Sequence, residues 1–173
     1  MMGVQLETER LILREMVEAD AVDIFEMDAD PEVYRYTGDF IPKSAADTRE
    51  RIHNYPDYKK YGYGRWTTAL KETGEIIGWC GLKYIEEMDE VDIGYRWKPK
   101  YWGNGYATEA SLACLEYGFK QLGLEQIIGQ LYPENKASIR VLEKIGMTFW
   151  KEMSDEKESW WAYRITKEEF GSL

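Results

Sequence analysis

The chain contains very little histidine and cysteine, and this scarcity excludes several kinds of active site. Its 173 residues include one histidine, His53, and two cysteines, Cys80 and Cys114. A histidine-based triad or metal cluster would need His53 itself, which lies in the polar stretch "ERIHNY". Two widely separated cysteines form neither a disulfide framework nor a metal motif. We therefore predict no metal site and interpret both cysteines as small buried residues.

The sequence also lacks long apolar runs and an excess of basic residues. No apolar stretch approaches the length of a membrane span, and the start "MMGVQLETER" lacks the features of a secretory signal. We therefore expect a cytoplasmic protein without a membrane partner. The formal net charge of −10 argues against nucleic acid, because phosphate binding requires a basic face. It mildly favours a cationic partner such as an amine or a basic peptide.

The pattern of apolar residues predicts one α+β domain spanning residues 1–173. Strands are predicted at 8–15, 65–71, 76–85, 91–99, 126–133, 147–153 and 159–166, and helices at 17–27, 45–55, 106–123 and 135–146. This order predicts a mainly antiparallel sheet. The unit at 91–131 would supply one parallel or splayed pair of strands.

The segment "YWGNGYATEA", residues 101–110, places two glycines directly before a predicted helix. Glycine lets a ligand approach the backbone, and a helix N-terminus offers unpaired N–H groups with a partial positive charge. Together they favour phosphate binding. The segment lacks the Lys-Ser/Thr of a Walker A loop and the third glycine of a dinucleotide fingerprint. A tight turn explains the bare motif equally well, but Gly94 and Pro99 interrupt the preceding strand and favour a long ligand with an amide-bearing arm.

Four segments resemble, in order and spacing, the GNAT superfamily of acetyl-CoA-dependent N-acetyltransferases. They are "LETERLILREMVEAD", "DIGYRWKPKYWGNGYATEA", "ENKASIRVLEKIGM" and "AYRITKEEF". More narrowly, they resemble the branch of ribosomal-protein N-terminal (alanine/serine) acetyltransferases. The resemblance implies the GNAT fold, with a central mixed sheet of about seven strands flanked by about four helices, and a monomer or homodimer. Trp102 stands where the superfamily usually has Gln or Arg, a departure that is familiar in this branch.

The resemblance also implies which residues hold acetyl-CoA. Loop N–H groups would bind the pyrophosphate, strand residues would pair with the pantetheine amides, and the later helix would contact the pantetheine arm. These residues are Tyr95, Arg96 and Trp97 in the strand, Trp102, Gly103, Asn104, Gly105, Tyr106, Ala107 and Thr108 at the loop and helix start, and Asn135 and Ser138 in the later helix.

Acetyl transfer to an amine needs a group that takes the amine proton and one that assists the leaving thiolate. Leu142 stands where many superfamily members carry a catalytic Tyr, so Ser138, on the helical face of Asn135, is the expected alternative. Gln130 aligns with the Glu that some members use as a base. We therefore predict Asp92 as the base, with solvent exposure or pairing with Lys or Arg as open alternatives.

Glu15 is a weaker rival base and a candidate acceptor contact, and water alone is a third possibility. Tyr34, Tyr36 and Trp66 belong to the part that covers the acceptor by resemblance, where they would wall a pocket for an amine or simply pack in the core. The predicted function is direct acetyl transfer to a primary amine at a peptide or protein N-terminus. The alternatives are a small cationic amine, such as a polyamine or aminoglycoside, and a non-catalytic acetyl-CoA-binding module.

Overall fold

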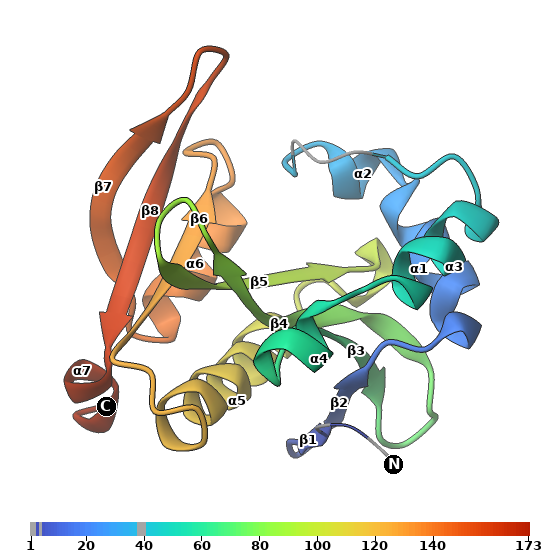
Figure 1. Cartoon of the computed structure of the whole chain (residues 1–173), viewed down its shortest axis with the longest axis horizontal. Coiled ribbons are helices and arrows are strands. Elements are labelled where there is room, and N and C mark those ends of the chain that lie inside the picture. The colour runs from blue at the N-terminus through green and yellow to red at the C-terminus, as the bar shows by residue number, and fades with distance from the viewer. Residues whose placement is uncertain (1–2, 4, 38–40) are drawn as a thin grey trace.

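A computed structural model describes residues 3, 5–37 and 41–173, which build an eight-stranded sheet with helices on both faces (Figure 1). The strand order is β1-β2-β3-β4-β5-β6-β8-β7. The strands are β1 (Gln5–Glu7), β2 (Leu11–Glu15), β3 (Arg65–Leu70), β4 (Ile76–Ile85), β5 (Glu90–Trp97), β6 (Gln126–Leu131), β7 (Thr148–Ser154) and β8 (Ser159–Thr166). The helices are α1 (Ala21–Asp28), α2 (Pro31–Tyr34), α3 (Ala45–His53), α4 (Asp57–Tyr61), α5 (Tyr106–Lys120), α6 (Lys136–Lys144) and α7 (Lys167–Gly171).

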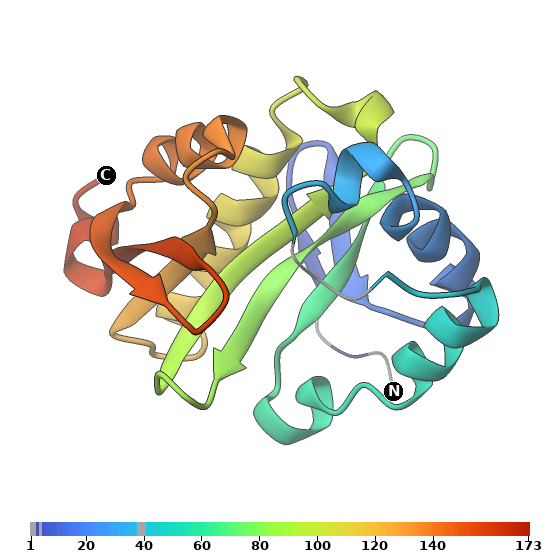
Figure 2. The ribbon, with the colours of Figure 1, turned by 90° about the horizontal axis from the view of Figure 1, so that it is seen from above.

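The sheet is antiparallel except where β5 meets β6. These two strands are parallel and pair at one position, Asp92 with Ile128. Beyond this point they separate, and Figures 1 and 2 show the two halves of the sheet splaying apart. β5 stays fully paired with β4 along its other edge. The splayed pair predicted for 91–131 is therefore confirmed.

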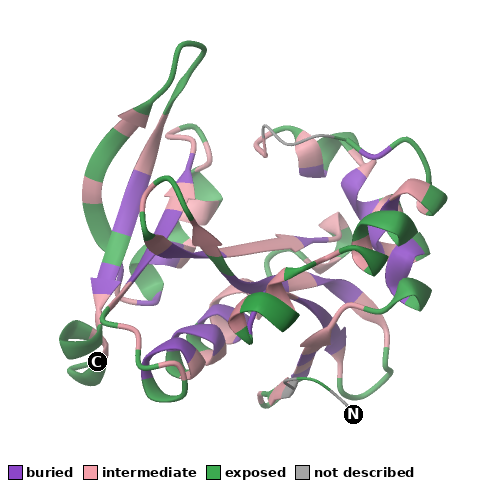
Figure 3. Cartoon of the chain, in the orientation of Figure 1, coloured by how far each residue is buried: buried purple, intermediate pink, exposed green. Residues whose placement is uncertain are grey.

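The two faces of the central strands carry different side chains, because residues paired across antiparallel strands share a face. Trp66, Cys80 and Tyr95 are aligned across β3, β4 and β5 and face α5. The opposite face, with Trp79 and Arg96, lies under the first helices, where Trp79 packs against α1 and α2 residues. Figure 3 shows the inner side of α5 buried and its outer side exposed.

Both cysteines lie in the core between β4 and α5. Cys80 and Cys114 are fully buried thiols whose sulfur atoms are 3.7 Å apart. Burial raises the pKa of Cys114 well above its usual range, so it stays a thiol at neutral pH. This confirms that they are small buried residues.

The structure adds short elements that the sequence pattern did not reveal. The predicted strand 8–15 is β2 alone, and β1 is a separate strand that brings the total among described residues to eight. α1 ends at Asp28, and Pro31 begins α2, because proline suits the first helical position and Asp30 accepts the Glu32 N–H at 2.9 Å. The tyrosine-rich stretch 55–64 contains α4. Among the described residues, no helix has the length and apolar character to span a membrane.

Candidate active site

The loop between β5 and α5 has the geometry of an anion-binding turn. Gly103 and Gly105 have φ values of 78° and 80°, which favour glycine. Gly105 is the N-cap of α5, and a Cβ added to Gly103 would meet no atom within 4 Å. Across the described residues, the backbone N–H groups from Gly103 to Thr108 donate to no backbone carbonyl. The helix N-terminus is thus exposed with its donors available.

Two predicted cofactor residues in this loop serve to hold its shape. The Trp102 indole donates to the Trp97 carbonyl at 2.9 Å. The Asn104 side-chain amide donates to the carbonyls of Tyr101 and Trp102 at 3.0 and 3.2 Å. These bonds keep the loop folded back on the end of β5, so the side chains of Trp102 and Asn104 fix the loop whose backbone carries the donors.

The start of α5 is anchored to the turn between β1 and β2. Glu109 accepts hydrogen bonds from the Thr8 hydroxyl at 2.6 Å, the Arg10 backbone N–H at 2.8 Å and the Arg10 side chain at 2.7 Å. Burial opposes ionisation of Glu109, but these donors lower its pKa. The Arg10 guanidinium also lies over the Tyr106 ring, 4.4 Å from its centre. A cation therefore sits beside the glycine loop, and no sequence motif had indicated it.

The β5 residues predicted to bind pantetheine have side chains that are already engaged. Arg96 donates to Asp28 at 2.8 Å and lies over the Trp79 ring at 5.2 Å. Trp97 is 7% exposed, and its ring stacks on that of Tyr95 with centres 6.2 Å apart. What these residues offer a ligand is their backbone, since β5 has no strand partner on its β6 side beyond Asp92 among the described residues.

Helix α6 brings Asn135 and Ser138 to the other side of the splayed strands. Asn135 is the N-cap and accepts the Ser138 N–H at 3.2 Å, which leaves its Nδ2 amide as a donor. The Tyr95 hydroxyl donates to Ser138 Oγ at 3.2 Å and so connects β5 to α6. Burial raises the pKa of Tyr95, so its phenol remains the donor in this pair.

Asp92 is buried and paired with an arginine, which was one of the alternatives left open. It is 5% exposed, and its Oδ2 accepts from Arg65 Nη2 at 2.6 Å. Burial raises the pKa of Asp92, while the charge and hydrogen bond of Arg65 and the donors of Gln130 partly oppose this rise. Those Gln130 donors do not reach Oδ1 in hydrogen-bond geometry, and Oδ1 has no hydrogen-bond partner among the described residues.

Gln130 lies on β6 beside Asp92, at the point where β5 and β6 part. Its Oε1 accepts from the Trp160 indole of β8 at 2.8 Å. Because an indole N–H only donates, this bond fixes the Gln130 carbonyl toward Trp160 and leaves the NH2 of its amide directed away from Trp160. The carboxyl of Asp92 therefore has an ordered polar neighbour on β6 as well as a cation on β3.

The predicted acceptor contacts do not gather in one place. Trp66 is 1% exposed and packs edge-on against Tyr117 of α5, so it belongs to the core and we remove it from the acceptor site. Glu15 is the cross-strand partner of Trp66 and shares its face, away from the carboxyl of Asp92. Tyr34 ends α2 and Tyr36 follows it, both half-buried. These two remain candidates on the helix layer that covers the opposite face.

Comparison with known proteins identifies the class. Residues 10–148 match the family described as Acetyltransferase (GNAT) domain, so the chain belongs to the GNAT acetyltransferase family. It is 40% identical over 151 residues to the uncharacterised protein YkkB of Bacillus subtilis (strain 168), covering 85% of this chain and 87% of that one. The crystal structure of a GNAT-family acetyltransferase from Bacillus anthracis is 32% identical, covers 95% of this chain and 99% of that chain, and has a TM-score of 0.79.

The narrower resemblance to ribosomal-protein acetyltransferases has less support. A ribosomal-protein-S5-alanine acetyltransferase from Vibrio fischeri superposes with a TM-score of 0.75, covering 97% of this chain and 99% of that chain, but is 20% identical. That likeness shows a shared fold alone. The superfamily is therefore established and the acceptor is not.

Proposed function

We propose that this protein is an acetyl-CoA-dependent N-acetyltransferase that moves the acetyl group directly to a primary amine. The observation that carries the proposal is the single β5–β6 pair, which leaves one edge of β5 without a strand partner next to the open N-terminus of α5. An extended ligand with amide groups can pair with such an edge, and its phosphates can meet the N–H groups after Gly103.

The residues in hand fit acetyl-CoA, which supplies an activated acetyl thioester when bound. In the proposed complex, the N–H groups from Gly103 to Thr108 hold the pyrophosphate, with Arg10 as a flanking cation. The backbone of Tyr95–Trp97 and the Nδ2 amide of Asn135 orient the pantetheine arm. Ser138 donates a hydrogen bond toward the thiol end. The direction of its bond with Tyr95 supports this role, because Ser138 Oγ accepts from Tyr95 and keeps its own proton to donate.

Asp92 is the proposed base for the acceptor amine. A general base must be able to hold a proton near neutral pH, and the raised pKa of this buried carboxyl moves it toward that range. The acceptor is proposed to be a peptide or protein N-terminus, with a polyamine or aminoglycoside as the second class. The net charge of −10 favours a cationic acceptor in both cases.

The donor site is tested by binding of coenzyme A, measured by calorimetry. Gly105→Ala adds a Cβ at the N-cap of α5, where we expect binding to weaken by about tenfold or more, since a lost ionic hydrogen bond costs about 1.5–3 kcal/mol. Gly123→Ala is the matched control, because Gly123 also has positive φ (69°) and open surroundings but lies at the far end of α5. Equal binding by the two variants would contradict the proposed donor site.

The acceptor is tested by thiol release with a panel of N-terminal peptides, polyamines and aminoglycosides. Turnover of peptides alone supports the first class, and turnover of small amines alone supports the second. If coenzyme A binds but no acceptor is acetylated, the protein is a non-catalytic binding module and the proposed function is wrong.

A further inference from the structure

The Arg65 guanidinium is held by three strands around the carboxyl of Asp92. Its Nη1 donates to the Gly81 carbonyl at 2.7 Å and to the Asp92 carbonyl at 3.2 Å, while Nη2 donates to Asp92 Oδ2 at 2.6 Å. Its Cζ lies 5.3 Å from the centre of the Trp79 ring. These contacts fix the guanidinium from its edge and its face, so Arg65 has one well-defined position.

Two glycines make room for Arg65, Gly94 for its guanidinium and Gly81 for its backbone. A Cβ on Gly94 would lie 2.7 Å from the Arg65 Cζ, and a Cβ on Gly81 would lie 2.1 Å from the Gly64 carbonyl oxygen and 2.8 Å from the Arg65 Cα. Gly81 is also the cross-strand partner of Arg65. Any larger side chain at Gly94 would push the guanidinium away from Asp92. Gly94 of β5 is therefore required by the Arg65 guanidinium, and Gly81 of β4 by the close approach of the β3 backbone.

The buried ion pair is incomplete in one specific way. Arg65 satisfies Oδ2 of Asp92, whereas Oδ1 is buried without a hydrogen-bond partner in the described structure. A buried carboxylate oxygen that lacks a donor costs free energy, so a donor is expected to reach it when the site is in use. Asp92 is the β5 residue that pairs with β6, so its buried, unpaired oxygen lies where the two strands begin to part.

The other charged groups near Asp92 are engaged or exposed. The neighbouring groups on its face, taken from β4, β5 and β8, are Lys83, Glu90, Arg96 and Arg164. Lys83 is exposed, and Glu90 accepts from Gln126 at 2.8 Å. Arg96 is paired with Asp28, and Arg164 lies over Trp150. Arg65 is thus the cation that bonds directly to the Asp92 carboxyl.

We propose that Arg65 is a positioning residue that keeps Asp92 ionised, with the unpaired Oδ1 as the atom that accepts a hydrogen from the acceptor amine. The inference rests on the proposed function. In the step, the amine nitrogen forms its bond to the acetyl carbon and the carbon–sulfur bond breaks, with its electron pair going to sulfur. The proton lost by nitrogen passes to Asp92 Oδ1, directly or through a water, and then to solvent. The thiolate takes an equivalent proton, so the charges balance.

The direct test is the titration of Asp92 by carbon-13 NMR of the aspartate-labelled protein, with the resonance assigned by its loss in Asp92→Asn. Removing the cation in Arg65→Gln is expected to move the titration of Asp92 to higher pH by about 1–3 units, because an adjacent positive charge lowers a carboxyl pKa by that amount. Arg14→Gln removes a second arginine of the same sheet and should leave the Asp92 titration unchanged. An unchanged Asp92 titration in Arg65→Gln would overturn the proposal.

The kinetic test separates positioning from simple support of the fold. If Asp92 must be ionised, activity falls as pH drops through its pKa, so Arg65→Gln should shift the acid limb of kcat/KM to higher pH. A purely structural Arg65 would lower the rate equally at every pH. Arg65→Lys keeps the charge and is the variant to use if Arg65→Gln folds poorly. It should titrate like the wild type but lose about tenfold or more in kcat, as expected when a catalytic group is misplaced.

The NMR titration of Asp92 does not depend on acetyl transfer. If no acceptor is turned over, the proposed function fails, while the titration still decides whether Arg65 keeps Asp92 ionised. If acceptors are turned over and the titration and acid limb of Arg65→Gln both match the wild type, the proposed function survives and the role of Arg65 is wrong.

Discussion

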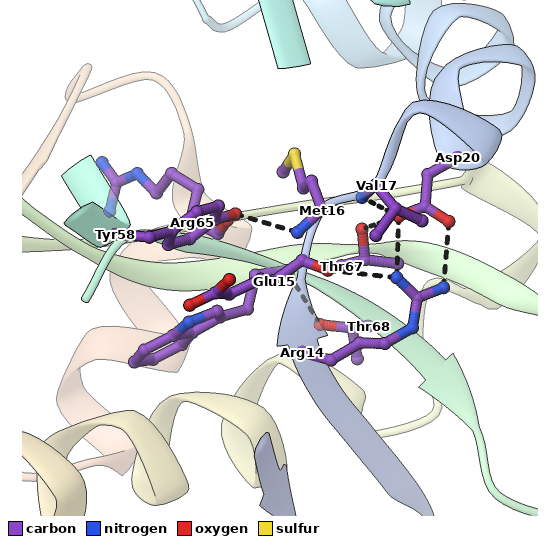
Figure 4. Close-up of polar contacts among 10 residues, drawn as sticks. Arg14, Glu15, Met16, Val17, Asp20, Tyr58, Arg65, Thr67 and Thr68 are labelled. Atoms are coloured by element: carbon purple, nitrogen blue, oxygen red, sulfur yellow. Dashed lines mark hydrogen bonds and ion pairs between the residues drawn. The ribbon is translucent and has the colours of Figure 1, made fainter. Parts of the chain in front are cut away.

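Two arginine–aspartate pairs in the same half of the sheet, Arg14 with Asp20 and Arg65 with Asp92, differ in how completely the carboxylate is bonded. Asp20 accepts from both Arg14 nitrogens at 2.8 and 2.9 Å, from the Val17 N–H at 3.0 Å and from the Thr67 hydroxyl at 2.8 Å (Figure 4). Asp92 accepts from Arg65 through Oδ2, and its Oδ1 lacks a partner among the described residues.

The pKa values of the two carboxyls are shifted in opposite directions. Burial opposes ionisation of both, but the donors around Asp20 outweigh it and lower the pKa of Asp20. At Asp92 burial dominates over the opposing effects of Arg65 and Gln130, and the pKa is raised. The pair of Arg14 with Asp20, in which both carboxylate oxygens are hydrogen-bonded, links β2, β3 and the start of α1. In the pair of Arg65 with Asp92, one carboxylate oxygen lacks a donor, so it can accept a further hydrogen, as a general base must.

The largest expected difference between the pairs is in catalysis. Asp92→Asn keeps the shape of the side chain but cannot take a proton, so kcat should fall by about 10²–10⁴-fold, the usual contribution of a general base. Asp20→Asn should leave the activity per folded molecule within about threefold of the wild type, since Asp20 makes no contact with the site. Steady-state kinetics on folded protein measures both. Equal activity of Asp92→Asn and wild type would assign the proton transfer to water.

For stability we expect the opposite order, with the larger effect from Asp20→Asn. Asp20→Asn leaves Arg14 without its anion and removes a joint between three segments, so the free energy of unfolding should fall by roughly 2–3 kcal/mol. This lies below the 3–5 kcal/mol typical of fully buried pairs, because the Arg14 side chain is 34% exposed. Asp92→Asn leaves Arg65, whose side chain is 16% exposed, without its anion, but it also removes a buried carboxylate with one unpaired oxygen. We expect this relief to outweigh the loss, so that Asp92→Asn costs less than Asp20→Asn. Urea unfolding at pH 7 compares the two variants, and a larger loss in Asp92→Asn would remove the distinction between the pairs.

The fold was largely predictable because its main elements carry local signals. The helix 106–123 and the strands 76–85 and 91–99 have clear apolar periods, and α5 and β4 lie where predicted. The sequence does not predict β1 or α2, because three and four residues are too few to show a period. The eighth strand therefore appears only in the structure.

The candidate site was predictable where one segment makes it and unpredictable where several segments meet. The loop with Gly103 and Gly105 is recognisable from its own short segment, and both glycines have positive φ. The pairing of Arg65 with Asp92 joins residues 27 positions apart and depends on the register of β3, β4 and β5. Trp66 was assigned to the acceptor although strand alternation places it on the face toward α5. Register, which composition does not encode, decides both cases.

The pH dependence of stability gives a second way to separate the pairs. The pKa of Asp20 is lower in the folded protein than its usual value of 3.8, so the folded state binds fewer protons than the unfolded state in this range. Its stabilising contribution is complete above the unfolded pKa and is lost as pH falls through the folded pKa. Unfolding free energies measured from pH 6 to pH 3 should therefore decline more steeply in the wild type than in Asp20→Asn. Parallel curves would show that Asp20 contributes nothing through its charge.

The smallest expected effect comes from removing one of the hydrogen-bond donors to Asp20, and it tests whether the remaining donors are sufficient. Thr67→Val removes one of four donors and keeps the side-chain volume, so Oδ2 of Asp20 still accepts from Arg14 and Val17. The cost should be about 1 kcal/mol, the net value of one hydrogen bond, with catalysis unchanged. Thr68→Val is the matched control at the next buried position, where the hydroxyl makes a 3.4 Å bond to the Trp66 carbonyl. If Thr67→Val alone lowered the free energy of unfolding by about 3 kcal/mol or more, the remaining donors would be insufficient and the Thr67 hydrogen bond would be essential to Asp20.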